Sequence, residues 1–216
     1  DDDLDRPPES SLVSRLFAVA GTLLRKGAVL VALLVLVVVG VRACQSTQGP
    51  SLQPWHTIIP DEPAASEISA GNWQGYLTAE QRMYEQLRRK LDSAMKPGDR
   101  TLHNRYYPAS LTSPEAFGHD WNRSYVLEPD GAAKGVVVLV HGLTDSPYSM
   151  RSVAELYRRH GFIAIAPRMP GHGTVPAGLT KAGRKEWHAT LEMTMAEARR
   201  RAAGRLPVHL VGYSNG

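Results

Sequence analysis

The chemistry in this sequence centres on one serine close to the end of the chain. Ser214 lies in Gly212-Tyr213-Ser214-Asn215-Gly216, directly after an apolar run that predicts a β-strand over 208–211. A serine on a sharp strand-to-helix turn needs close neighbours without Cβ atoms, and Gly212 and Gly216 meet that need. Such a turn lifts the hydroxyl above the carboxyl edge of a sheet, where it can attack a carbonyl carbon. The pattern therefore predicts that Ser214 is a nucleophile.

A second motif follows an apolar strand predicted over 136–140 and reads His141-Gly142-Leu143-Thr144-Asp145. Where a serine occupies this kind of turn, the loop after such a strand supplies one backbone N–H of an oxyanion hole, and the residue after the serine supplies the other. The expected donors are the N–H groups of Leu143 and Asn215. Gly142 would let the backbone approach the substrate oxygen closely.

His141 has two interpretations, as a catalytic base or as a residue that fixes its loop by hydrogen bonding. We favour the second, because the acid and the base follow the serine along chains that carry this turn. Both are then expected after Ser214. The sequence starts at Asp1 and stops at Gly216 inside the motif, so we interpret it as a fragment that is inactive by itself.

Three stretches occur in an order and spacing that resemble the α/β-hydrolase superfamily. They are HGLTDS over 141–146, PRMPGHG over 167–173 and VGYSNG over 211–216. The similarity, which covers about 124–216, is to the branch with monoacylglycerol lipases, lysophospholipases, carboxylesterases and serine aminopeptidase-like proteins. It implies a mostly parallel sheet, truncated here after the serine turn, and a serine hydrolase that cleaves carboxylic esters through an acyl-enzyme. It also implies that Gly171-His172-Gly173 shapes a turn.

Other function classes stay open at this point. A serine peptidase or an acyltransferase would use the same serine with a different leaving group or acceptor, and a non-catalytic, membrane-anchored member would lack the downstream acid or histidine. The expected substrate is a small-molecule ester or lipid, and the motifs are silent on its acyl chain.

The elements that must position these motifs alternate between strands and helices. Strands are predicted over 124–128, 136–140, 162–166 and 208–211, and helices begin at Ser146-Pro147 and around Trp187. Short connections between them imply a parallel sheet with right-handed crossovers, in an α/β fold. Before this domain, taken as 106–216, an amphipathic helix is expected from Thr78 to Lys96 within a helical extension over 78–105.

An apolar run near the start of the chain predicts a transmembrane helix over 27–44. A buried core helix and a cleaved signal peptide are the alternatives. Cations concentrate before the run, at Arg15, Arg25 and Lys26, against Arg42 after it. The positive-inside rule then places residues 1–26 in the cytoplasm and the hydrolase domain outside, with 45–77 as a Ser/Pro/Gly-rich linker.

The composition excludes several other classes. A formal net charge of +4 without a basic patch argues against a nucleic-acid partner. The single cysteine, Cys44, rules out an internal disulfide, and the eight histidines are dispersed. We expect no metal and no cofactor.

Overall fold

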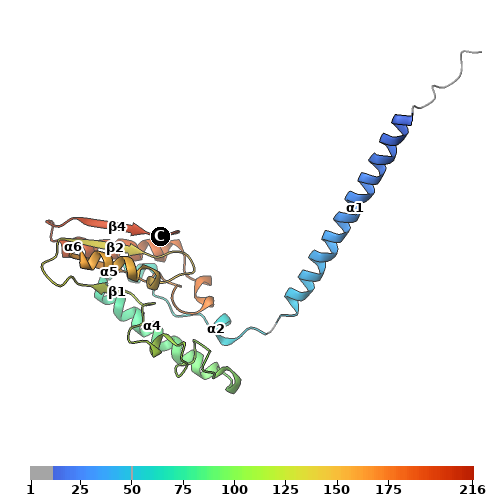
Figure 1. Ribbon diagram of the computed structural model, residues 1–216. Coiled ribbons are helices and arrows are strands. Elements are labelled where there is room, and N and C mark those ends of the chain that lie inside the picture. Colours follow the sequence, from blue (N-terminus) through green and yellow to red (C-terminus); the bar gives the residue numbers. More distant parts are fainter. Residues whose placement is uncertain (1–11, 50) are drawn as a thin grey trace, which may run out of the picture. The chain divides into compact units, whose positions relative to one another are not determined.

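The computed structural model describes residues 12–49 and 51–216, and it divides the chain between Ser51 and Leu52 into two units. The first unit contains the helix α1 (Leu12–Thr47), and the second is a compact unit of helices around a sheet (Figure 1).

Helix α1 extends beyond the predicted segment 27–44 on both sides, and its side chains from Ser14 onward are exposed. The stretch Ser14–Thr47 is long and apolar enough to cross a membrane, a test that a signal sequence or a buried core helix also passes. Of the segment predicted to be cytoplasmic, residues 1–11 lie outside the described residues, and 12–26 belong to α1.

The compact unit is built on a four-stranded sheet with the spatial order β1-β3-β2-β4. The strands are β1 (Tyr125–Leu127), β2 (Gly135–Val140), β3 (Phe162–Ala166) and β4 (Val208–Gly212). Strand β2 pairs in parallel with both β3 and β4, and β1 runs antiparallel to β3. The sheet is therefore mixed, and the predicted α/β class is confirmed.

Helices cover both faces of this sheet. The side chains of strand β2 alternate between the two faces, and the strand is therefore fully buried. Val137 and Leu139 pack with α5 (Arg151–Arg159), whereas Val136, Val138 and Val140 face α6 (Arg184–Ala202).

The start of the helix predicted at Ser146-Pro147 needed correction. The helix predicted at Ser146 begins instead as a 3-10 turn, Pro147–Met150, that leads into α5. Ser146 does not cap it through its side chain, because its hydroxyl donates to the Asn122 side-chain oxygen at 2.9 Å. Helix α6 ends at Ala202, and the next residue, Ala203, has a φ of 48° in the left-handed region.

The helix predicted from Thr78 to Lys96 is α4 (Trp73–Ala94), which starts five residues earlier. Its N-cap is Asn72, whose side-chain oxygen accepts from the Gly75 N–H at 2.9 Å. Thr78 lies within the helix and donates to the Gln74 carbonyl.

Much of the segment predicted as a linker, 45–77, is ordered against the compact unit. It contains α2 (Pro54–Thr57) and α3 (Ala65–Ala70). Ile68 of α3 belongs to the core on the α6 side of the sheet, and Trp55 packs with Leu87 and Leu91 of α4. The apolar side chains in this segment explain the difference, because each is covered on folding.

Candidate active site at the end of strand β4

Ser214 occupies a tight turn at the end of β4. Its φ is 55°, a conformation that residues other than glycine seldom adopt. The turn is held by two backbone hydrogen bonds of 3.0 Å, from the Tyr213 N–H to the Val140 carbonyl and from the Gly216 N–H to the Tyr213 carbonyl. The Ser214 side chain is exposed. Non-glycine residues in this region cost of order 1–3 kcal/mol and cluster at functional sites.

Both glycines of the motif lie where a side chain would not fit. A Cβ atom on Gly212 would collide with the Gly216 backbone, and one on Gly216 would collide with the Val140 carbonyl. The turn therefore closes on itself and on the end of β2 only because both positions lack side chains.

The loop after β2 lies directly against the serine. A Cβ atom on Gly142 would be 3.1 Å from the Ser214 Cβ and 3.2 Å from the Tyr213 carbonyl oxygen. Leu143 and Asn215 line the same pocket of about 380 Å³, together with Gly142 and Trp187. The structure thus brings together the two loops expected to carry the oxyanion-hole donors.

His141 is buried beside this pocket, and both of its ring nitrogens are engaged. Its Nε2 accepts from the Met169 N–H at 3.1 Å, so the neutral ring carries its proton on Nδ1, which donates to the Gly142 carbonyl at 3.0 Å. Burial lowers the His141 pKa to about 4, and the nearby His172 and Arg168 act in the same direction. His141 is therefore a neutral hydrogen-bonding residue whose ring is not available to Ser214.

This hydrogen bond orients the peptide between Gly142 and Leu143. In a trans peptide the C=O and N–H groups point in opposite directions. Because the Gly142 carbonyl is held by the His141 ring, the Leu143 N–H is directed to the other side of the peptide, away from that ring.

The loop after β3, residues 167–173, is fixed by a buried charge cluster that the sequence did not reveal. The fully buried Arg168 guanidinium donates to both Glu62 carboxylate oxygens at 2.9 Å and to a Glu80 oxygen at 2.7 Å. Burial disfavours the Arg168 charge, but the two carboxylates outweigh burial and hold its pKa well above the ordinary value. The available signal was the arginine at the end of an apolar strand, since a buried charge needs partners.

His172 lies between the two other rings of this region. Its ring centroid is 5.0 Å from that of His141 and 5.4 Å from that of Trp187, whose indole N–H donates to the Pro170 carbonyl at 2.9 Å. Burial lowers the pKa of His172. These contacts agree with the turn-shaping role expected for residues 171–173.

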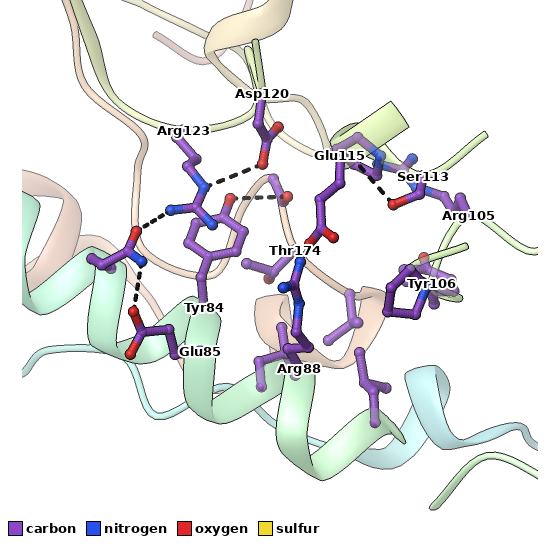
Figure 2. A pocket seen from close by; sticks show the side chains of 17 residues that line it. Tyr84, Glu85, Arg88, Arg105, Tyr106, Ser113, Glu115, Asp120, Arg123 and Thr174 are labelled. Carbon is purple, nitrogen blue, oxygen red and sulfur yellow. Dashed lines mark hydrogen bonds and ion pairs between the residues drawn. The ribbon is translucent and has the colours of Figure 1, made fainter. Parts of the chain in front are cut away.

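A second cavity, of about 240 Å³, lies between α4, residues 105–123 and 173–175 (Figure 2). Four of its charged side chains form ion pairs, Arg123 with Asp120 at 3.2 Å and Arg88 with Glu115. Because those charges are already neutralised, we place the chemistry in the pocket beside Ser214.

Within residues 12–49 and 51–216, Ser214 makes no side-chain hydrogen bond to a histidine or a carboxylate. The same described part of the chain contains no group of three or more His, Cys, Asp or Glu side chains placed to hold a metal ion.

No family model matches this chain, but similar chains are found both among curated proteins and among solved structures. A thermostable monoacylglycerol lipase from Bacillus sp. (strain H-257) is 40% identical over 67 residues, which are 30% of this chain and 27% of that lipase. A solved chain from work on LipS and LipT, two metagenome-derived lipolytic enzymes, has a TM-score of 0.36 and 29% identity. That alignment covers 44% of this chain and 36% of the solved one.

The chain thus spans about a quarter of the length of the lipase that it matches. Over that stretch, its sequence similarity relates it to the lipase- and esterase-like α/β-hydrolases.

Proposed function

We propose that the protein containing this chain hydrolyses carboxylic esters and that Ser214 is its nucleophile. The observation that carries the proposal is the left-handed φ of Ser214, in a turn packed against Gly142. Strain of this kind is retained where it positions a reactive group. The similarity to a monoacylglycerol lipase supports esters as the substrate class.

In the proposed reaction, the Ser214 oxygen attacks the ester carbonyl carbon, and the alcohol leaves with a proton as the acyl-enzyme forms. Water then attacks the acyl-enzyme, releases the carboxylic acid and restores the serine. The N–H groups of Leu143 and Asn215 would stabilise the oxyanion in both steps. Losing one such donor costs about 3–4 kcal/mol in a comparable hydrolase.

A general base must accept the serine proton, and His141 does not fit that role. Its Nε2 is occupied by the Met169 N–H, and its pKa of about 4 makes it a weak base. The proposal therefore places the base after Ser214, in the chain order that the family resemblance implies.

We further propose that α1 anchors the protein in a membrane, with the compact unit on the extracytoplasmic side. The length and apolar composition of α1 support a span. The orientation follows from Arg15, Arg25 and Lys26 before the apolar run, against Arg42 after it. The substrate would then be an ester or lipid that reaches this membrane surface.

The test is covalent labelling of the intact protein with a fluorophosphonate, which reacts with activated serine hydroxyls. We expect the unaltered protein to be labelled and Ser214→Ala to lose all labelling. Ser149→Ala is the matched control, because Ser149 is also exposed but only donates to the Ser146 carbonyl.

Peptide mapping of the labelled protein should place the adduct on Ser214. Labelling that persists in Ser214→Ala, or an adduct on another residue, would overturn the assignment of the nucleophile.

A further inference from the structure

We propose that Glu62 is a positioning residue for the reaction at Ser214. It acts through the loop 167–173 on the peptide group between Gly142 and Leu143, which carries the Leu143 N–H. The inference rests on the proposed function, because it concerns the geometry of the same oxyanion hole. Glu62 lies in the stretch between α2 and α3, far from Ser214 in sequence.

The first step is the contact between Glu62 and the loop. Its carboxylate accepts from two nitrogens of the Arg168 guanidinium and from the Gly171 N–H, each at 2.9 Å. The Glu62 side chain is 9% exposed and that of Arg168 is fully buried. A bidentate pair of this kind fixes orientation as well as distance.

The backbone around Glu62 is restricted, so the carboxylate is held in place from its own side too. Pro60 and Pro63 flank it and are both buried. Proline fixes its own φ and limits the residue before it, which lowers the entropy lost on ordering this stretch.

Helix α4 holds the same loop from a second direction. Glu80 accepts from the Arg168 Nε–H at 2.7 Å, and the Tyr84 hydroxyl, seen in Figure 2, donates to the Gly173 carbonyl at 3.1 Å. Arg168 closes the loop on itself by donating to the His172 carbonyl at 3.0 Å. Of these contacts, only that of Glu62 reaches the Gly171 N–H.

The second step is the contact between the loop 167–173 and the Gly142–Leu143 peptide group. The Met169 N–H donates to His141 Nε2, which fixes the tautomer that lets Nδ1–H hold the Gly142 carbonyl. If residues 168–171 shift, the Met169 N–H moves with them. His141 then loses the partner that sets its ring orientation, and the Leu143 N–H loses its direction.

The experiment compares Glu62→Gln with Asp61→Asn in the intact protein. Glu62→Gln keeps the shape but removes the charge and one acceptor oxygen. Asp61 is the matched control, since it is the preceding acid and makes a 2.7 Å pair with Lys90 between exposed side chains. The readouts are kcat and KM for a short soluble p-nitrophenyl ester, and the fluorophosphonate labelling rate per labelled site.

We expect Glu62→Gln to lower kcat and the labelling rate by about tenfold, with KM within about twofold of the unaltered protein. The loss should be smaller than the 10²–10³-fold effect of removing an oxyanion donor, because the donor is misdirected and still present. Asp61→Asn should leave both rates unchanged. A per-site rate does not depend on how much protein is folded, so a purely structural role for Glu62 would not change it.

An unchanged kcat and per-site rate in Glu62→Gln would overturn the inference. If that variant yields no folded protein, Glu62→Asp decides, because it keeps the charge and withdraws the carboxylate by one methylene. At least a threefold slower per-site rate supports the positioning role, and an unaltered rate overturns it. Failure of the nucleophile assignment is distinguishable, because Ser214→Ala would then still be labelled.

Discussion

At the residue scale, the site depends on three glycines, which have no Cβ atom. Gly142, Gly212 and Gly216 each lie where a Cβ atom would press on the serine turn or on the strand beside it. Their spacing was readable from the sequence, because a closed turn between a strand and a helix leaves no room for side chains at these positions. The tautomer of His141 was not readable, since it depends on the Met169 N–H, 28 residues away.

Gly142 offers a direct test of how close the two loops lie. In Gly142→Ala, the new Cβ would sit 3.1 Å from the Ser214 Cβ, so the turn must move by a few tenths of an ångström. Since a misplacement of 1 Å can cost about 10²-fold in rate, we expect kcat to fall by roughly tenfold. Kinetics on a soluble ester would measure this.

Gly131→Ala is the control for this substitution, because nothing lies within 4 Å of a Cβ atom at Gly131. Full activity in Gly142→Ala would contradict the close packing of the loop after β2 on the turn that holds Ser214.

At the element scale, elements with a strong apolar pattern were predicted more accurately than segments held in place by residues far away in the sequence. Strands β2 and β3 were recognised within one residue, because strands buried on both faces are continuously apolar. The start of α4 was placed at Thr78, five residues late, and its N-cap is Asn72. The stretch holding Glu62 resembled a linker, because its proline-rich composition is typical of one and its partner Arg168 is remote.

The end of α6 provides a stability test at this scale. Ala203 adopts a φ of 48°, a conformation that costs an L-residue with a Cβ roughly 1–2 kcal/mol and glycine almost nothing. We expect Ala203→Gly to raise the free energy of unfolding by about 0.5–1 kcal/mol, after the higher entropy of unfolded glycine is counted. Urea denaturation of the compact unit within the intact protein would measure it.

The same substitution inside α6 should have the opposite sign. Ala196 is exposed in the middle of the helix, and Ala196→Gly should destabilise by about 1 kcal/mol. If Ala203→Gly and Ala196→Gly lower the free energy of unfolding equally, the left-handed conformation assigned to Ala203 is wrong.

At the scale of the whole molecule, the division between Ser51 and Leu52 separates a helix suited to lipid from a unit with its own core. We expect the intact protein to stay with membranes through alkaline carbonate washing, which removes peripheral proteins. A version that begins at Leu52 should instead be released into the supernatant. Immunoblotting of the two fractions would measure this.

The orientation can be tested with an introduced cysteine, because Cys44 is the single cysteine of this sequence and can be replaced. With Cys44→Ser as the background, we expect a membrane-impermeant maleimide added to intact cells to label Ser46→Cys, which lies after the predicted span 27–44, and not to label Cys44→Ser alone. A mature protein that starts after α1, detected by mass spectrometry, would show a cleaved signal sequence instead and contradict the anchor.

The pairing of Glu62 with Arg168 also has a consequence for the order in which the protein assembles during synthesis. The two residues are 106 positions apart, and at about 5–20 residues per second the ribosome needs roughly 5–20 s to go from one to the other. During that interval the Glu62 carboxylate stays hydrated. Ser214 follows Arg168 by another 46 positions (214 − 168), so we expect the loop to be in place before the nucleophile is made. Ser214 would then be added to the chain after the loop 167–173 is ordered, and its strained turn would form against the residues after β2 that this loop holds.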